Sequence, residues 1–405
     1  MSHLRALVAL VLAVALTPLL LTAPGAAAPV RTGAAGSTDT SAYKTARKAQ
    51  SARLTVLPKI AQKGKGVAKA DRARAVGEVK VTPATEDRKV VVQRSSDAGG
   101  TWSTFGTTKK TNAKGIVYFT PAATTAGTTW TYRAKVAKQK SLPAFTTGQA
   151  ADRWSMIFED QFAGSSLDKA IWSTRGDFYD KGSKRKCSKA SPKMAQVGSG
   201  ALTLKVKKDP ARRGDVCKWR SPGGKVKKFN YYLNGHVGTD ASFTFRYGVA
   251  AARVKFQKPQ GMHGSFWMNT SGEPEGRHAV EIDTVEHFGK GYKDGGLAQF
   301  LHYKGRKIGG VQKSANDVLV GSDSWWKKYH VFSVVWTPAG YSFRIDGHET
   351  FRTTKARSDK QVLAILSLLS SDWELDKMPK TGKGSMKVDW FRVWQDQSIA
   401  GRNLQ

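Results

Sequence analysis

Three carboxylates lie within six residues of one apolar segment, and this crowding limits what the chain can fold into. Residues 279–288 are predicted to form a short strand that contains Glu281, Asp283 and Glu286. On a regular strand alternate side chains share a face, so Glu281 and Asp283 would point one way and Glu286 the other. One extra residue, a β-bulge at Thr284 and Val285, would turn Glu286 onto the face of its two partners.

Three acids on one wall of a cleft favour catalysis over the alternative of a solvated acidic strand edge. The chain has 66 Lys and Arg against 31 Asp and Glu, yet no basic residue separates these three acids. Buried carboxylates without partners are costly, so clustered acids on an apolar strand indicate a functional site. Repulsion between like charges can keep one carboxyl protonated beside an ionised one, which suits cleavage of a glycosidic bond by two carboxyls.

The first 28 residues have the features of a secretory signal peptide. Basic residues come first, an apolar run follows over residues 6–21, and three small residues end the segment at Ala26, Ala27 and Ala28. A retained membrane anchor is the alternative, but no basic stop signal follows the run. No second apolar run approaches the roughly 18 residues that a membrane span needs. We therefore expect a secreted, extracellular protein with no membrane span once residues 1–28 are removed.

Export makes the two cysteines, Cys187 and Cys217, a predicted disulfide, with two free thiols as the alternative. Closing the loop between them would stabilise the fold by roughly 3 to 4 kcal/mol on the chain-entropy model. The sequence has no Cys and His cluster with zinc spacing, so we predict no transition-metal site.

The net charge of +35 predicts attraction to anionic surfaces. An anionic cell wall, an acidic or sulfated polysaccharide and extracellular nucleic acid are candidate partners. A lysine-rich surface that only maintains solubility is the alternative. We expect no specific nucleic-acid partner, because no nucleic-acid-binding motif accompanies the charge. We also expect a monomer.

The N-terminal third divides into two parts by composition. Residues 29–77 are rich in Ala, Lys, Arg and Ser, which predicts a disordered basic linker that binds polyanions, with a transient helix over residues 43–56. Residues 78–147 have short alternating strands separated by Gly, Asn and Asp turns, which predicts a small immunoglobulin-like or fibronectin-like β-sandwich. Trp102 and Trp130 fit the core of such a sandwich, and a sugar-stacking platform is the alternative.

Residues 152–396 are predicted to be all β. Apolar and polar residues alternate over residues 202–206 and 341–345, as in half-buried strands. Residues 362–369 are apolar apart from Ser367, and their length and surroundings favour a buried strand. Many short strands without a long amphipathic helix predict a two-sheet jelly roll.

Segments throughout residues 152–396 resemble glycoside hydrolase family 16. Residues 281–286 are similar to the family signature in its bulged form, with two residues between the Asp and the second Glu. Further similarities follow the family's strand order, at residues 158–162, 247–256, 264–268, 329–338 and 388–394. The resemblance implies a concanavalin A-like β-jelly-roll sandwich whose open groove cleaves a polysaccharide internally, with retention of configuration.

The resemblance also implies roles for the three acids. Glu281 would be the nucleophile, Asp283 the auxiliary carboxylate and Glu286 the general acid/base. Asp283 would hydrogen-bond Glu281 and hold a negative charge that keeps Glu286 protonated until it donates to the leaving oxygen.

Four further residues are candidates for sugar contacts. Trp267 matches a family tryptophan that stacks on a sugar ring. Asn234 takes the place of a small polar residue in the family's groove. His302 and Trp373 are weaker candidates, with structural roles as the alternative.

The resemblance raises one metal site, a structural calcium near Asp389 on the convex side. The family's opening strand usually has an acid where this chain has Gln161. Calcium prefers several oxygen ligands, so the expectation is an ion that is structural and not required.

The bulged signature is similar to those of laminarinase, agarase and carrageenase types. We expect a β-1,3-linked glucan as substrate. An agar-like, carrageenan-like or other anionic galactan remains open, as does transglycosylation by capture of a covalent intermediate. A carbohydrate-binding protein without turnover is a further alternative, which the three clustered acids disfavour.

Overall fold

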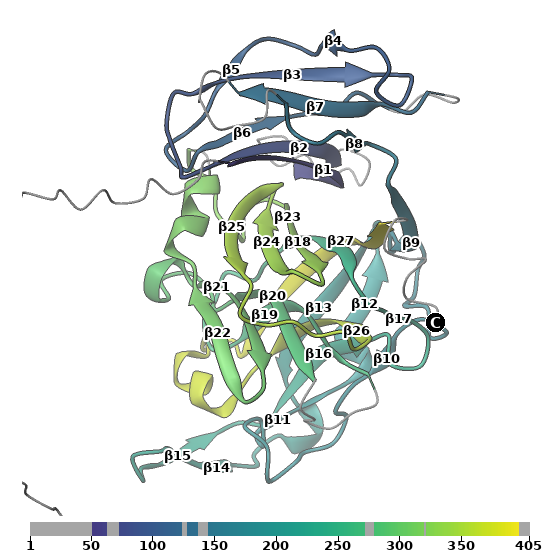
Figure 1. Ribbon diagram of the computed structural model, residues 1–405. Helices are drawn as coiled ribbons and strands as arrows, with labels where there is room; N and C mark the ends of the chain where they lie inside the picture. The colour runs from purple at the N-terminus through teal and green to yellow at the C-terminus, as the bar shows by residue number, and fades with distance from the viewer. Residues whose placement is uncertain are drawn as a thin grey trace, which may run out of the picture. The chain divides into compact units, whose positions relative to one another are not determined.

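The computed structural model describes residues 51–62, 73–123, 128–136, 145–271, 279–319 and 321–396 (Figure 1). All of these belong to one compact unit, residues 48–405. The predicted signal peptide and residues 29–50 and 63–72 of the predicted linker lie outside the described residues. Within the part described, no helix is both long enough and apolar enough to cross a membrane.

Two antiparallel sheets build the region of residues 152–396. The front sheet carries the three predicted acids on its third strand. Its order from one edge is β22 (Arg306–Val311), β21 (Leu297–Tyr303), β20 (Val280–His287), β19 (His263–Thr270) and β26 (Val362–Leu369), followed by β16 (Tyr232–Gly238) and β17 (Thr244–Phe245), with β10 (Ser173–Thr174) on β16.

The back sheet is centred on the long strand β27. Its order is β25 (His348–Thr353), β24 (Gly340–Ile345), β23 (His330–Thr337), β18 (Gly248–Lys255) and β27 (Lys383–Asp396). The other side of β27 pairs with β9 (Trp154–Asp160) and with β13 (Ala201–Lys208), and β13 pairs in turn with β12 (Ala195–Gly198). Strand β16 also pairs with β13, so the two sheets meet there.

Short elements complete this region. Strand β11 (Ser188–Ala190) runs parallel to β16, and β14 (Cys217–Arg220) and β15 (Val226–Phe229) form a hairpin. The 3-10 helices are η2 (Pro192–Met194), η3 (Pro210–Arg212), η4 (Lys293–Gly295), η5 (Lys313–Val318) and η6 (Asp372–Lys377).

The facing sides of the two sheets form one apolar core. Ile282 and Val285 of β20 pack in it with Phe266 of β19 and Phe391 of β27. Strand β26 is buried at every residue, and the apolar side chains of β13 are buried in alternation, as predicted. The predicted all-β jelly roll is therefore confirmed, because each sheet buries an apolar face against the other.

Strand β24 differs from its pattern, since alternation alone predicts polar residues in solvent. Ser342 and Arg344 are buried like their apolar neighbours. The Arg344 guanidinium bonds the carboxylate of Glu78 at 2.6 Å, and Ser342 donates to Glu349 at 2.8 Å. The outer face of this strand is thus covered by residues that satisfy its polar groups.

Residues 51–150 form two small sheets (Figure 1, purple to teal). Val56, Val79, Val92 and Tyr132 are among the residues of a separate core there. The immunoglobulin-like or fibronectin-like assignment stays a prediction. One sheet is β1 (Ser51–Gln62), β2 (Ala73–Thr82) and β6 (Ile116–Phe119); the other is β4 (Ser103–Thr104), β3 (Lys89–Ser95), β7 (Thr131–Val136) and β8 (Gln149–Ala150), with β5 (Lys109–Lys110) on β3.

The structure differs from the predicted disordered linker, and from the transient helix, in part of residues 29–77. Residues 51–62 form β1, and residues 73–77 begin β2. Leu57, Ile60 and Val76 from these strands share a core cluster with back-sheet residues. The average composition of the segment hid these apolar positions, which are buried in part against the back sheet.

The two tryptophans of the small sheets are half-buried, not fully in the core. The Arg133 guanidinium lies 4.2 Å from the Trp102 ring, and that of Arg94 lies 4.1 Å from the Trp130 ring. Trp130 also packs against the small core. Each ring thus has a face covered by an arginine, which disfavours sugar stacking on that face.

Candidate active site

The predicted β-bulge in β20 is confirmed by its register with both neighbouring strands. Val285 pairs with Phe266 and Ile282 with Met268, so β20 has one residue more than β19 over this interval. The same extra residue separates Asp283 and Glu286 against β21. Ile282 and Val285 enter the core, and the three acids take the opposite side of the strand, as the bulge predicts.

Glu281 and Glu286 line an open pocket of about 300 Å³ on the front sheet. Asp283 lies deeper, with its side chain close to that of Glu281 and only 3% of its surface exposed. Aromatic rings of Phe288, Tyr292 and Trp373 form part of the same pocket. Such rings next to carboxyls provide apolar contact surface for the C–H faces of a sugar.

Burial raises the pKa of all three acids. The pKa of Asp283 is raised furthest from its usual range, by burial and then by the negative charges of Glu286 and Glu281. Its Oδ2 atom has no hydrogen-bond partner among the described residues. This differs from the expectation that Asp283 holds a negative charge, because desolvation favours its neutral form.

His302 and Lys307 continue a row that begins at Glu281. Glu281 pairs with His302 across β20 and β21, and His302 pairs with Lys307 across β21 and β22. His302 Nε2 lies 3.7 Å from a Glu281 oxygen. Burial raises the pKa of Glu281, and His302 followed by Arg185 opposes that rise. Positive neighbours thus favour the ionised form that a nucleophile needs.

Glu286 has a different neighbour, the buried His263. The His263 Nε2 atom lies 3.9 Å from Glu286 Oε1, and Nδ1 lies 2.6 Å from Glu374 Oε2. Burial lowers the pKa of His263, but the Glu374 carboxylate outweighs it and the net shift is upward. Burial raises the pKa of Glu286, and His263 opposes that rise. The acid/base candidate therefore contacts a His–Glu pair that influences its proton affinity.

The two stronger sugar-contact predictions, Asn234 and Trp267, are not among the residues that line this pocket. Asn234 is 1% exposed, and its amide bonds the hydroxyls of Ser188 and Ser370. Trp267 is half-buried, donates its indole N–H to Ser367 Oγ at 3.1 Å and stacks on His236. These contacts give Asn234 a structural environment, because its donors and acceptors are already occupied.

The two weaker predictions, His302 and Trp373, do line the pocket and are about half exposed. Sequence reasoning missed His263, Lys307 and Arg185, which lie there too. A readable signal existed only for the partner of His263: Ser371 and Glu374 form a capping box, whose spacing marks a helix start.

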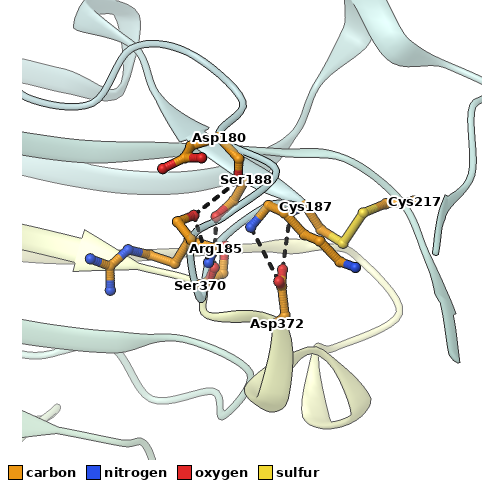
Figure 2. The surroundings of a disulfide bond; sticks show 9 residues. Asp180, Arg185, Cys187, Ser188, Cys217, Ser370 and Asp372 are labelled. Atoms are coloured by element: carbon orange, nitrogen blue, oxygen red, sulfur yellow. Dashed lines mark hydrogen bonds between the residues drawn. A yellow bond between two sulfur atoms is a disulfide. The ribbon is translucent and has the colours of Figure 1, made fainter. Parts of the chain in front are cut away.

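A disulfide holds the segment that carries Arg185, and it confirms the predicted pairing of Cys187 with Cys217. Figure 2 shows the Asp372 carboxylate beside Cys187. It accepts hydrogen bonds from the backbone N–H groups of Lys186 at 3.1 Å and Cys187 at 3.0 Å. The segment before β11 is thus fixed to η6, which also carries Trp373 and Glu374.

The residues near Asp389 do not fit the calcium site that the resemblance raised. The Asp389 carboxylate pairs with the buried guanidinium of Arg253 at 2.7 Å. Across the described ranges, the group of three acidic or imidazole side chains close enough to share an ion is Glu281, Asp283 and His302. Calcium needs several oxygen ligands, whereas the charge of Asp389 is already balanced.

A model of the glycosyl hydrolases family 16 matches residues 183–392, which is more than half of the chain. The chain belongs to glycosyl hydrolase family 16. This family 16 member is therefore an enzyme that acts on glycosidic bonds, and the matched residues include β20 with its three acids.

One curated relative is the Glucan endo-1,3-beta-glucosidase A1 of Niallia circulans. It is 20% identical over 284 residues, which cover 65% of this chain and 41% of that protein. The family 16 chain thus spans less than half the length of the relative it matches.

Two solved structures are also similar. The endo-1,3-beta-glucanase (laminarinase) catalytic domain of Thermotoga petrophila RKU-1 is 19% identical, with a TM-score of 0.47 and coverage of 60% of this chain and 98% of that one. The endo-beta-1,3-glucanase of Pyrococcus furiosus is 21% identical, with a TM-score of 0.47 and coverage of 60% and 94%.

Proposed function

We propose that the chain is a secreted, endo-acting hydrolase of a β-1,3-linked glucan that retains the anomeric configuration. The observation that carries the proposal is the bulged strand β20, which brings Glu281 and Glu286 to one pocket wall with Asp283 between them. The family supports cleavage of a glycosidic bond. The Niallia circulans relative is named as a glucan endo-1,3-beta-glucosidase, which supports a β-1,3-linked glucan.

In the first step the Glu281 carboxylate attacks the anomeric carbon and forms a C–O bond to it. The glycosidic C–O bond breaks, and the Glu286 carboxyl gives its proton to the departing oxygen. The raised pKa of Glu286 supports the acid role, because the carboxyl keeps its proton to a higher pH. The positive charges near Glu281 support the nucleophile role.

In the second step the Glu286 carboxylate takes a proton from water. The resulting hydroxide oxygen bonds the anomeric carbon, and the bond to Glu281 breaks, which restores the free enzyme. At this stage Glu286 must be ionised, and His263 at 3.9 Å favours that form. A neutral Asp283 could donate a hydrogen bond to Glu281 as it leaves, since burial favours the protonated carboxyl.

The nucleophile assignment is tested with Glu281→Gly. We expect loss of hydrolysis with polysaccharide binding retained, and external azide should restore cleavage as an inverted glycosyl azide. Full activity of the variant without azide would contradict the assignment. Early products of the unaltered enzyme, followed by NMR, should keep the anomeric configuration of the substrate.

The substrate is tested by incubating the purified protein with laminarin, lichenan, agarose, carrageenan and xyloglucan, followed by analysis of product sizes. We expect medium-length oligosaccharides from laminarin. Release from agarose or carrageenan instead would favour an anionic or other galactan, and products longer than the substrate would favour transglycosylation. No release from any polymer would favour a binding protein.

Secretion is part of the proposal and is supported by the apolar run, the small residues before Pro29 and the disulfide. N-terminal sequencing of protein collected from the culture medium should begin close to residue 29. Protein found only inside the cells, with residues 1–28 attached, would contradict it.

A further inference from the structure

Three cationic side chains line the pocket of the candidate nucleophile without an ion-pair partner among the described residues. Lys184, Arg185 and Lys307 all line the pocket that contains Glu281. Within the described part of the chain, their side chains form no ion pair or hydrogen bond. Cations that approach a carboxylate cluster without pairing with it remain available to a ligand.

Lys307 is placed by the sheet itself. It follows His302 in the cross-strand row from Glu281, and its Nζ atom lies 3.8 Å from the centre of the Phe300 ring. Phe300 is 4% exposed, so the ring is a fixed support for the ammonium group. The charge is therefore held at the pocket wall, although most of the lysine side chain is exposed.

Arg185 and Lys184 come from the opposite side, on the segment before β11. The Lys184 carbonyl accepts the Asp372 N–H at 2.9 Å, and the Arg185 N–H donates to Ser183 Oγ at 3.1 Å. In Figure 2 the Arg185 side chain extends away from the disulfide, with its guanidinium clear of Asp180 and Asp372. Hydrogen bonds thus hold the backbone of Lys184 and Arg185, and the Arg185 side chain lines the pocket.

Neutralising the negative charge of the catalytic acids does not require all three cations. Burial raises the pKa of all three acids, so each carboxyl keeps its proton to a higher pH than a free one. Glu281 is the acid that these cations influence most, and His302 is closer to it than 4 Å. The pocket lining thus has three cationic side chains, Lys184, Arg185 and Lys307, against two carboxyls, those of Glu281 and Glu286.

We propose that Lys184, Arg185 and Lys307 form a subsite for an anionic substituent, a carboxylate or sulfate group, on the polysaccharide that this enzyme cleaves. A guanidinium binds either group through two parallel N–H donors, and the lysines add charge from both sides. The inference rests on the proposed function, since it places the subsite beside the bond to be cut. The subsite would make the enzyme prefer a polysaccharide with a carboxylate or sulfate group over a neutral glucan.

The test compares one short β-1,3-glucan oligosaccharide in three forms: neutral, carboxymethylated and sulfated. Short oligosaccharides are essential, because a long polyanion would bind any face of a chain with a net charge of +35. The proteins are the unaltered enzyme, the double variant Arg185→Gln with Lys307→Gln, and Arg306→Gln. Arg306 is the matched control, since it is exposed, adjacent to Lys307 and outside the pocket lining.

In the unaltered enzyme, kcat/KM for one charged form should exceed that for the neutral form by about tenfold, as expected for hydrogen bonds to charged groups. The double variant should lose this ratio and Arg306→Gln should keep it. The charged form that gains identifies carboxylate or sulfate. No preference in the unaltered enzyme, or a preference that survives in the double variant, overturns the subsite.

Calorimetric binding of the same oligosaccharides separates this outcome from failure of the proposed function. Cleavage of the neutral form without any charge preference supports the glucanase and overturns the subsite. If no form is cleaved, tighter binding of a charged form that the double variant loses supports the subsite alone. Equal binding of all three forms in that case overturns it as well.

Discussion

His263 lies between two carboxylates, and its surroundings influence how Glu286 holds its proton. Glu374 contacts one ring nitrogen and Glu286 faces the other, while the positive charge of Arg185 acts on the ring from the β11 side. The Phe288 ring packs 5.6 Å away. The position of Glu374 is fixed, because its carboxylate also accepts the Ser371 N–H at 2.9 Å.

Replacement of this histidine should move the basic limb of the pH–rate profile. In His263→Gln the positive neighbour of Glu286 is lost, while the negative charge of Glu374 remains. The pKa of Glu286 therefore rises. The first step needs protonated Glu286, and activity is lost as pH rises through its pKa. We expect the basic limb of kcat/KM to move up by about one pH unit.

His302→Gln is the matched control for that profile. His302 lowers the pKa of Glu281, so its loss raises that pKa and moves the acidic limb to higher pH, because Glu281 must be ionised to attack. A shift of the acidic limb by His263→Gln, or no shift at all, would contradict the pairing of His263 with Glu286.

The sequence predicted the positions of single residues well where they depend on one strand, and less well where they depend on contacts between elements. Glu281, Asp283 and Glu286 follow from strand alternation and one bulge. Asn234 was expected in the groove, but its partners Ser188 and Ser370 come from distant elements, and they occupy its amide. No local pattern gives such contacts, since they depend on how separate elements pack.

The number of residues between Asp283 and Glu286 in β20 decides which face of the strand Glu286 takes, and deletions can test this. Removal of Thr284 returns the strand to simple alternation with Glu281, Asp283 and Glu286 still at alternate positions. We expect this variant to keep measurable activity, because all three carboxylates stay on the pocket side. Hydrolysis of laminarin by equal amounts of folded protein measures it.

Removal of Thr284 together with Val285 is the contrasting change. Glu286 then takes a core-facing position, so the general acid is lost and kcat should fall by about 10² to 10⁴-fold. A carboxyl directed into the core should also lower the melting temperature. Equal activity of the single and double deletions would show that the spacing between Asp283 and Glu286 does not position Glu286.

Among the strands that are buried on both faces, one was predicted from the sequence and one was missed. β26 was predicted because all but one of its eight residues are apolar. β1 was missed, since Leu57 and Ile60 lie in a Lys-rich and Ala-rich segment without regular alternation and find apolar partners on the back sheet. Its burial depends on a surface almost two hundred residues away in the chain, which composition cannot reveal.

For the whole molecule, the position of β1 changes how the basic N-terminal segment can be tested. Deletion of residues 29–77 would remove β1 and should destabilise the protein, because Val249 and Trp390 would lose their cover. Deletion of residues 29–50 alone should leave the melting temperature unchanged.

We expect the shorter deletion to weaken binding to a polyanion at low salt, with neutral-substrate turnover retained. Binding to heparin resin as a function of salt concentration measures the effect. An elution position equal to that of the full chain would show that residues 29–50 do not contribute to polyanion binding.

The buried pair of Glu78 and Arg344 links the small sheets to the back sheet, and it gives the most direct test of that contact. Both side chains are 1% exposed, and their closest atoms are 2.6 Å apart. In Glu78→Ala the guanidinium keeps only the Gly347 carbonyl at 3.0 Å and a Glu349 oxygen at 3.4 Å. We expect the free energy of unfolding to fall by about 3 kcal/mol, because a buried charge loses its main partner.

Lys80→Ala is the control on the same strand. Lys80 pairs with Glu349 at 3.0 Å but is 30% exposed, so its loss should cost no more than about 1 kcal/mol. The double change Glu78→Leu with Arg344→Met should recover much of the lost stability, since it removes both charges together. Urea denaturation of the four proteins decides the matter: equal effects of Glu78→Ala and Lys80→Ala would mean that apolar packing alone holds β1 and β2 against the back sheet.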